Sequence, residues 1–467
     1  MSEAPRPLAV LVAIRLPDMD ATESDASLDE LARLVTTLGY DVSARVVQAR
    51  ATLAPAAVLG EGKLKELAAL TGGSGRPHAL LPQALRAQQR RQAQSGQAED
   101  DDFADDAAYG DGDGDGEPVG PPIALVAVDH DVSPSQLRNL ERACGVPVLD
   151  RTGIIIEIFH RHAHSREAKL QVEIARLAYE APRLRESPRG KERQQGRGAG
   201  EAALELDRRK IRDRIAELRS ELVAIAREQD VRRQQRRGAR RVALIGYTNA
   251  GKSSLMRALT SSEVYVEDKL FATLDTTVRA LTPATKPRIL ISDTVGFIKK
   301  LPHDLVASFK STLDEALEAS LLLHVVDAAD PSFRQQLEVT RSVLREIGAL
   351  EIPGRLVMNK IDQLSPEALA ALQAEEPDAW FISAKSPPDV ASVRGRIIEF
   401  FESRYVQAEL TVPYSEQRLV SEMHEQGRVV SERYDEQGVT VLFRGDREVV
   451  EAFRARLDPP QMRSAAP

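Results

Sequence analysis

Residues 246–253 read Gly-Tyr-Thr-Asn-Ala-Gly-Lys-Ser and lie between an apolar run, 242–245, and a helical run, 254–259. A glycine-rich turn between a strand and a helix directs successive backbone N–H groups into one concavity, at the positive end of the helix dipole. Lys252 can then reach the β- and γ-phosphates of a nucleotide, and the Ser253 hydroxyl can ligate Mg²⁺. The stretch therefore predicts a nucleoside triphosphate site rather than a chance match in a surface loop.

A second motif, Asn359-Lys360-Ile361-Asp362, predicts which base is bound. It ends the apolar run 355–358, where a base-reading loop is expected. The Asp362 carboxylate can accept two hydrogen bonds, from N1–H and from the exocyclic amine of guanine. Adenine offers neither donor on that edge, and a buried carboxylate left unpaired is costly. The motif therefore favours guanine.

Two further motifs complete the pattern. Residues 293–296, Asp-Thr-Val-Gly, end the apolar run 289–292, so that Asp293 would orient a Mg²⁺-bound water and the Gly296 N–H would contact the γ-phosphate. Residues 383–385, Ser-Ala-Lys, follow a short apolar run where the loop that packs on guanine is expected. The four motifs, in this order, predict a GTP-binding domain of the translation-factor-related class. Their predicted nucleotide contacts are Gly246, Tyr247, Thr248, Asn249, Ala250, Gly251, Lys252, Ser253, Ser254, Asp293, Thr294, Val295, Gly296, Asn359, Lys360, Ile361, Asp362, Ser383, Ala384 and Lys385.

Length and composition limit the class of protein. A chain of 467 residues, 42% hydrophobic, is too long for one core and predicts two to four domains. Its one cysteine, Cys144, excludes an intramolecular disulfide framework and is expected to be a small buried residue. No apolar run approaches the roughly 18 residues that span a bilayer. We expect a monomeric cytoplasmic protein, with peripheral membrane association as the alternative.

Charge is distributed unevenly along the chain. The formal net charge is −8, but residues 99–117 hold ten acidic residues and no Lys or Arg. Residues 183–241 hold 19 Lys and Arg against 10 Asp and Glu, a local excess of nine positive charges. A basic segment with few aromatic residues suits contact with a phosphate backbone rather than base stacking. We therefore expect an RNA contact within residues 183–241.

The N-terminal third predicts alternating strands and helices. Strands are expected at 8–14, 40–48 and 123–128, a helix at 27–38, and a turn that opens another helix at 59–67. Residues 95–122 are predicted to be a disordered acidic insertion; a Ca²⁺ loop is disfavoured because Pro122 occupies the position that would need Glu. Ser133, Pro134 and Gln136 predict a capping box at a helix start.

Residues 147–159 read as a strand that ends near three alternating histidines, His160, His162 and His164. Alternate histidines on one strand face could bind a metal ion. With many arginines and no cysteine nearby, a solvated or RNA-facing segment is the favoured interpretation.

Two long helices are expected at about 165–182 and 201–235, with apolar residues at heptad-like spacing and a Gly/Arg/Gln-rich stretch, 185–200, between them. They predict an antiparallel coiled-coil hairpin with a basic tip. Beyond the GTPase domain, strands at 409–413, 429–433 and 439–443 and a helix at 415–425 predict a small α+β module, with half of a ferredoxin-like fold as one possibility. The predicted layout is an N-terminal α/β domain (1–164), the hairpin (165–238), a GTPase domain with a mostly parallel sheet (239–405), the α+β domain (406–457) and a tail (458–467).

The whole pattern resembles the HflX family of ribosome-associated GTPases. The matching stretches are "SPSQLRNLE" at 133–141, "LDRTGIIIEIFHRHAHSREAKLQVEIARLAYEAPRL" at 149–184, "GYTNAGKSSLMRAL" at 246–259, "LFATLD" at 270–275 and "DTVGFIKKLPHDLVASFKSTLDEA" at 293–316. One loop differs: the family typically has "RGPGETQLE", whereas residues 197–205 read "RGAGEAALE". The resemblance implies a protein that binds the large (50S) ribosomal subunit and its rRNA and splits stalled or idle 70S ribosomes when GTP is bound.

Two other functions remain open at this point. One is a GTPase that assists large-subunit assembly. The other is an RNA-binding or RNA-remodelling protein whose N-terminal domain uses ATP. No second complete nucleotide motif precedes residue 240, which disfavours the latter.

The resemblance also assigns switch I. It places the Mg²⁺-binding threonine of that switch at Thr273, beside Ser253, whereas Thr276 and Thr277 fit equally by spacing. The switch I contacts that it implies are Phe271, Ala272, Thr273, Leu274 and Asp275. The predicted catalytic residues are Lys252, Thr273 and Gly296, with Asp293 bound to Mg²⁺ through water.

Two positions predict how hydrolysis is controlled. Phe297 follows the 293–296 motif where related enzymes carry a water-positioning glutamine, so hydrolysis is expected to be slow until a partner supplies the missing group. Asn249 stands where K⁺-activated GTPases use an asparagine to hold a potassium ion; its alternative role is to brace the loop. The expected cofactors are Mg²⁺ and, on the first interpretation of Asn249, K⁺.

Overall fold

The computed structural model describes residues 5–17, 19–54, 56–76, 122–184, 199–234, 240–261, 270–271, 276–299 and 315–457. The predicted acidic insertion (apart from Pro122), most of the basic tip, switch I residues 272–275 and the C-terminal tail lie outside these ranges. The chain forms two compact units, residues 1–161 with 176–211, and residues 162–175 with 212–467. Within the described residues, no helix is both long and apolar enough to cross a membrane.

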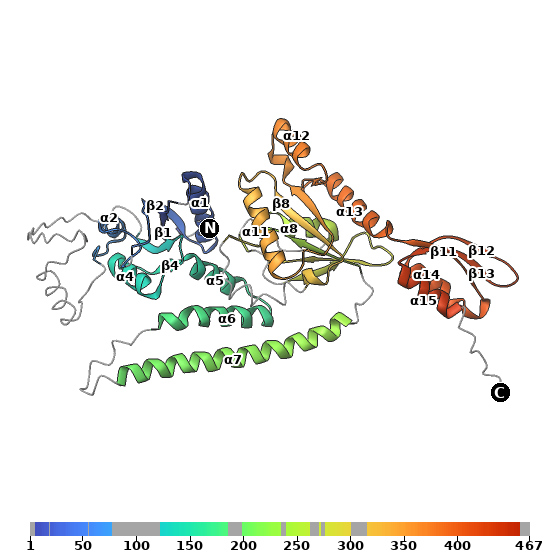
Figure 1. Cartoon of the computed structure of the whole chain (residues 1–467), viewed down its shortest axis with the longest axis horizontal. Helices are drawn as coiled ribbons and strands as arrows, with labels where there is room; N and C mark the ends of the chain where they lie inside the picture. The colour runs from blue at the N-terminus through green and yellow to red at the C-terminus, as the bar shows by residue number, and fades with distance from the viewer. Residues whose placement is uncertain are drawn as a thin grey trace, which may run out of the picture. The chain divides into compact units, whose positions relative to one another are not determined.

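The first sheet is parallel, in the order β2-β1-β3-β4. Its elements are β1 (Leu8–Arg15), α1 (Ala21–Thr37), β2 (Asp41–Ala49), α2 (Glu61–Thr71), β3 (Ile123–Val128), α4 (Pro134–Cys144), β4 (Val148–Asp150) and α5 (Arg151–His162). Helices cover both faces of this parallel sheet, which is why β1 is apolar at every position before Arg15 (Figure 1). Because β1 pairs with both β2 and β3, the chain on either side of the predicted insertion belongs to one sheet, as predicted.

Two local predictions in this sheet are confirmed. Ser133 and Gln136 form the reciprocal capping box at the start of α4, with Pro134 in the first turn. Cys144 ends α4 in the core, where burial raises the pKa of its thiol to about 12. A thiol with so high a pKa is protonated at neutral pH, so Cys144 packs as an apolar residue and is not a nucleophile.

The predicted strand at 147–159 is wrong beyond Asp150, because α5 follows β4 directly. The Asp150 carboxylate accepts a hydrogen bond from the Gly153 N–H at 2.8 Å, which satisfies a free donor in the first turn of the helix. Residues 153–156 are buried, so this helix lacks the polar face that reveals helical periodicity. His160 and His162 therefore lie on a helix, not on one strand face. No cluster of three or more His, Cys, Asp or Glu that could bind a metal occurs in the described parts of the chain.

Arg151 is the centre of a buried ion network. Its guanidinium donates to the Asp129 carboxylate at 2.7 Å and also to Glu30, and its side chain is 1% exposed. The network joins α1, the end of β3 and the start of α5. Buried charges are tolerated only when they are paired, so the three side chains depend on one another.

The two long helices are α6 (Arg166–Glu180) and α7 (Ala199–Gln234). Arg166 is paired with Glu221 at 3.1 Å, and Arg214 with Glu173 at 3.1 Å. From the first pair to the second, the residue number rises along α6 and falls along α7. The two helices therefore run antiparallel, as predicted. Leu218 is fully buried, whereas most of the described side chains of α7 are exposed.

The second sheet has the order β10-β9-β8-β5-β7-β6 and is parallel except for β6. Its elements are β5 (Arg240–Ile245), α8 (Lys252–Thr260), β6 (Thr277–Ala280), β7 (Ile289–Asp293), β8 (Leu321–Asp327), α11 (Phe333–Glu346), β9 (Gly354–Asn359), α12 (Pro366–Glu375), β10 (Trp380–Phe381) and α13 (Pro387–Glu402). Val242 and Leu244 pack with α8 and α13, and Ala243 and Ile245 with α11. In this sheet β7 lies on one side of β5 and β8, which comes later in the chain, lies on the other. The strand order therefore reverses at β5, and ligands of such sheets bind at the carboxyl ends of the strands at this point.

The third sheet is antiparallel, in the order β11-β13-β12. Its elements are β11 (Val406–Val412), α14 (Arg418–Gln426), β12 (Arg428–Tyr434), β13 (Val439–Gly445) and α15 (Arg447–Leu457). Both helices pack on one face of the sheet (Figure 1). The sequence analysis missed α15, although Val450, Phe453 and Leu457 have helical spacing. The pairing of β12 with β13 shifts register between Val429 and Ser431, which is a bulge.

We expect Arg151→Met to lower the local free energy of unfolding of β1 and β3 by about 3–5 kcal/mol, because it leaves Asp129 and Glu30 buried without their cation. Hydrogen exchange of the β1 and β3 amides in the full chain measures this.

The control is Arg45→Met. Arg45 of β2 is paired with Asp29 of α1 at 2.7 Å, but both side chains are exposed, so the loss should stay below about 1 kcal/mol. Equal losses in the two variants would contradict the importance of the buried network.

Candidate nucleotide site

The loop 246–251 joins β5 to α8 and can be formed only with glycine at both ends. A Cβ at Gly246 would lie 2.1 Å from the Val325 carbonyl oxygen, and Gly246 has φ 146°. A Cβ at Gly251 would lie 2.2 Å from the Asn359 side-chain nitrogen, and Gly251 has φ 92°. Each glycine therefore has a positive φ, and a neighbouring atom lies so close to its Cα that no side chain would fit there. Asn249, with φ 59°, also adopts the left-handed conformation, which asparagine tolerates.

The loop holds the amine of Lys252 in place. Nζ donates to the carbonyl oxygens of Gly246 at 3.0 Å and Tyr247 at 2.8 Å. An ammonium group has three N–H donors. Two of them bind these loop carbonyls, so the third can bind a phosphate oxygen. Burial lowers the pKa of Lys252 to about 8, and the Asp293 carboxylate acts in the opposite direction.

Hard oxygen donors meet beside the lysine. The Ser253 hydroxyl donates to the Asp293 carboxylate at 2.6 Å, joining the start of α8 to the end of β7. Asp293 is fully buried, and the next residue, Thr294, donates from its hydroxyl to the Leu244 carbonyl at 2.8 Å. One hydroxyl and one carboxylate fit Mg²⁺, which typically takes a few protein oxygens and completes its shell with phosphates and water.

The segment after Asp293 lies against the loop. A Cβ at Gly296 would lie 3.0 Å from Lys252 Nζ and 2.8 Å from the Thr248 Cα. Phe297 is buried and packs with Ala243 and Ile245 of β5 rather than facing the loop. Its ring therefore cannot contact a water molecule at the phosphates.

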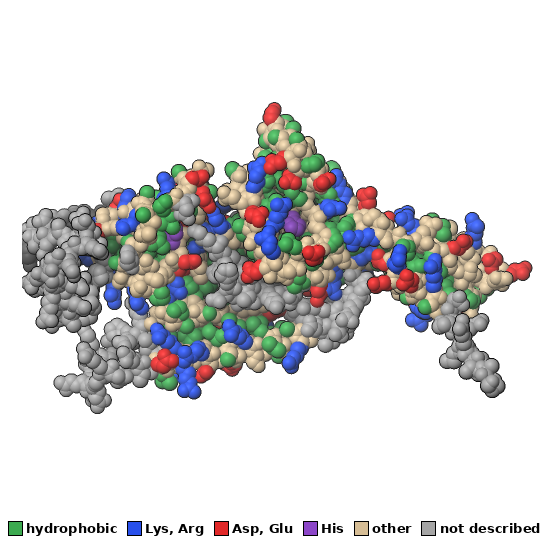
Figure 2. Space-filling model, in the orientation of Figure 1, with side chains coloured by type: hydrophobic (Ala, Val, Ile, Leu, Met, Phe, Trp, Pro, Cys, Tyr) green, Lys and Arg blue, Asp and Glu red, His purple; other side chains and the backbone are tan. Residues whose placement is uncertain are grey.

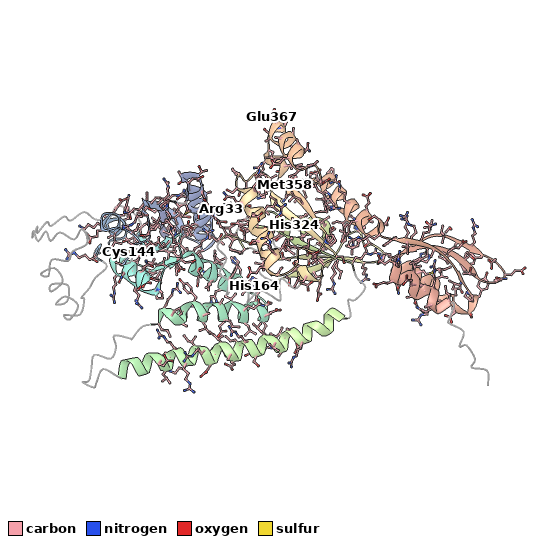
Figure 3. All side chains as sticks on the ribbon, in the orientation of Figure 1. Arg33, Cys144, His164, His324, Met358 and Glu367 are labelled. Atoms are coloured by element: carbon pink, nitrogen blue, oxygen red, sulfur yellow. The ribbon has the colours of Figure 1, made fainter. Side chains whose placement is uncertain are left out.

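The predicted base-reading residues come from two strands that end side by side. β9 runs through buried Met358 to Asn359, and its parallel neighbour β10 ends at Phe381, just before the 383–385 loop. Figure 3 labels Met358 in this sheet. The Asn359 amide donates to the Ala250 carbonyl at 2.9 Å and accepts from the Ala384 N–H at 3.0 Å. One buried side chain thus connects the phosphate loop, β9 and the 383–385 loop.

The remaining residues of these loops are held by acidic side chains. Lys360 has φ 63° and donates from Nζ to Asp327 at 2.7 Å. The Ser383 N–H donates to the Asp389 carboxylate at 2.8 Å. Asp362 lies exposed in a short 3₁₀ turn, Ile361–Gln363, where a base could reach it.

The structure thus brings together the phosphate loop, the 293–296 motif and both base loops. Of the predicted switch I residues, only Phe271 is described, buried with φ 58°, and residues 272–275 lie outside the described ranges. The sequence analysis missed Asp327 and Asp389. Asp327 ends an apolar strand and Asp389 follows Ser-Pro-Pro at a helix start, so both carried a local signal.

Comparison with known proteins agrees with this site. Family models match residues 25–96 with 120–160 (GTP-binding GTPase N-terminal), 162–236 (GTP-binding GTPase middle region) and 241–360 (50S ribosome-binding GTPase). The chain is 59% identical to the GTPase HflX of Gluconacetobacter diazotrophicus, over 95% of this chain and 96% of that protein. The chain belongs to the HflX family of GTPases. It is also 43% identical to the GTPase HflX of Escherichia coli K12, over 68% of this chain and 77% of that protein.

As an HflX GTPase, the chain binds guanine nucleotides and hydrolyses GTP to GDP and phosphate. Its multidomain α/β architecture with a mostly parallel GTPase sheet is as predicted. Among solved structures, a GTP-binding protein of Sulfolobus solfataricus in complex with GDP is 20% identical, over 84% of this chain and 98% of that chain, with a TM-score of 0.40. Era of Aquifex aeolicus bound to GDP.AlF4- is 23% identical, over 34% and 56%, with a TM-score of 0.29.

The lowered pKa of Lys252 predicts proton uptake when HflX binds a nucleotide at alkaline pH. Below pH 8 the amine is already charged, so affinity should be independent of its titration. Above pH 8 the free site holds a neutral amine that must gain a proton to bind phosphate, so affinity for GDP should fall by up to about tenfold per pH unit.

Fluorescent GDP titrations from about pH 7 to about pH 9 measure this. The control is Lys252→Arg, whose guanidinium stays charged over this range. The affinity of this variant for GDP should therefore not fall above pH 8, whatever its value at pH 7. Parallel pH profiles in the two proteins would assign the effect to the nucleotide instead.

Proposed function

We propose that this HflX protein is a ribosome-associated GTPase that binds the 50S subunit and splits stalled or idle 70S ribosomes in a GTP-dependent manner. The observation that carries the proposal is the match of residues 241–360 to the family described as 50S ribosome-binding GTPase, within a chain that aligns with HflX proteins over most of its length. Such a protein acts as a monomer in the cytoplasm. Its parts would be the domains 1–164, 165–238, 239–405 and 406–457, with the tail 458–467.

Within the nucleotide site, Lys252 and the loop amides would stabilise charge on the β–γ bridge, and Asp362 would read guanine. Ser253 and Thr273 would ligate Mg²⁺, with Asp293 bound to it through water; the ion would neutralise phosphate charge. Gly296 would contact the γ-phosphate through its N–H. The short distance between Ser253 and Asp293, and the closeness of Gly296 to Lys252, support these roles.

Phe297 supports a slow intrinsic reaction. A buried phenyl ring can neither orient the attacking water nor accept its proton, and no covalent intermediate is needed for phosphoryl transfer to water. The missing group would come from the ribosome. GTP would order switch I and Gly296, and hydrolysis would release them, coupling ribosome binding to the nucleotide state.

The RNA contact would include the helix α7. Its nine Lys and Arg residues are interspersed with eight Asp and Glu residues, and Figure 2 shows both kinds of side chain on its surface. Its exposed cations include Arg209 and Arg219, for which the backbone phosphates of rRNA are the natural partners. A GTPase acting in large-subunit assembly would use the same surface on ribosomal precursors. An ATP-dependent activity of the N-terminal domain has no supporting observation in the described residues.

Co-sedimentation with 70S, 50S and 30S particles tests the proposal, in GDP, in a non-hydrolysable GTP analogue and without nucleotide. We expect analogue-dependent pelleting with 50S, loss of the 70S peak and faster GTP turnover with ribosomes. Binding to precursors but not to mature particles would favour assembly. No binding in any state would leave a GTPase without a ribosome.

The same assay localises the RNA contact. Arg209→Glu with Arg219→Glu should weaken 50S binding by at least about tenfold and flatten its salt dependence, because two phosphate contacts become repulsive. The matched control changes the same charge on exposed residues of α15, Arg447→Glu with Arg454→Glu, and should bind normally.

The role of Asn249 in K⁺ activation is a separate proposal, and its position in the loop supports it. GTP turnover should be several-fold faster in KCl than in NaCl of equal ionic strength. Asn249→Gly, which keeps the positive φ without strain, should abolish that difference. Equal rates for the unchanged protein in both salts would mean that Asn249 only braces the loop.

A further inference from the structure

The segment after Gly296 is tied to the phosphate loop by three hydrogen bonds. The Phe297 N–H donates to the Gly246 carbonyl at 3.1 Å, and the Thr248 N–H donates to the Phe297 carbonyl at 2.8 Å. The third comes from a side chain: the Tyr247 hydroxyl accepts from the Lys299 N–H at 2.6 Å. Two bonds belong to any sequence in this backbone geometry, whereas the third exists only because residue 247 is tyrosine.

The tyrosine bond holds the segment beyond the point where the backbone bonds end. On one side of that point, Phe297 is fixed by its ring, which is buried under β5. On the other side, Lys299 is two residues further along and is held by the hydroxyl of Tyr247. Tyr247 is itself buried, so its ring has little freedom and its oxygen is a fixed point.

The position of this segment decides where Gly296 lies. Gly296 is in contact with the loop at Thr248 and next to the Lys252 amine, the group placed to meet the β- and γ-phosphates. If Lys299 were released while Phe297 stayed bound, the segment could rotate about Phe297 and carry the Gly296 N–H away from a γ-phosphate. This rotation would leave the α- and β-phosphate contacts of the loop unchanged.

We propose that Tyr247 is a positioning residue for the γ-phosphate: its hydroxyl holds the segment 296–299 against the phosphate loop, and so gives the site part of its preference for GTP over GDP. The inference rests on GTP binding by this chain and is independent of any ribosomal role.

Tyr247→Phe in the full chain tests this by removing one oxygen atom. Affinity for a non-hydrolysable GTP analogue should fall about three- to tenfold, which corresponds to one hydrogen bond, while affinity for GDP stays within about twofold. The turnover number for GTP should fall with the analogue affinity. Hydrogen exchange at the Lys299 amide should become faster, which reports the lost bond directly.

Retained GDP affinity shows that the variant is folded. The matched control is Tyr414→Phe, which removes a hydroxyl that donates to the Asp435 carbonyl at 2.8 Å in the C-terminal sheet region. It should change neither nucleotide affinity. An equal loss for GDP and the analogue would make Tyr247 a general support of the loop and overturn the proposal. Unchanged affinities together with faster exchange at Lys299 would overturn it as well.

Discussion

The amide side chain of Asn359 is the interaction on which the nucleotide site depends. It is almost fully buried, and both of its polar atoms are bonded, to the Ala250 carbonyl and to the Ala384 N–H. Aspartate could not donate to Ala250, and leucine would leave the buried Ala250 carbonyl and the half-buried Ala384 N–H without this partner. The phosphate loop and the base loops come from strands far apart in the chain. This one amide sets their separation, and so the length of nucleotide that fits between them.

Around that amide, the site is built by close approach to glycine backbone. Gly246 lies against the backbone of β8, Gly251 against the Asn359 side chain, and Gly296 against Thr248. Rigid packing of this kind fixes the groups that meet a phosphate before any ligand arrives, so little reorganisation is needed at the moment of reaction.

The motifs of the candidate site could be found in the sequence because they are local. The spacing of glycine and lysine in residues 246–253 can be recognised without knowing the fold, and so can polar residues that end strands. The described residues of these motifs lie together in the structure. Prediction failed at α5, where Ile154, Ile155 and Ile156 are all buried and no polar face marks the helix. It also could not foresee the bond between Tyr247 and Lys299 or the ion pair between Glu30 and Arg151. Those partners are separated by 52 and 121 residues and meet only through tertiary packing.

The bulge in β12 has a consequence for how copies of this protein behave in a crowded solution. Both β11 and β12 are edge strands of a small sheet, and an open edge is a template for another strand. The register shift between Val429 and Ser431 breaks the regular repeat of N–H and C=O groups along β12, and charged Arg428 and Arg433 flank it. The bulge and the charged side chains therefore disfavour pairing of this edge with a strand of another copy.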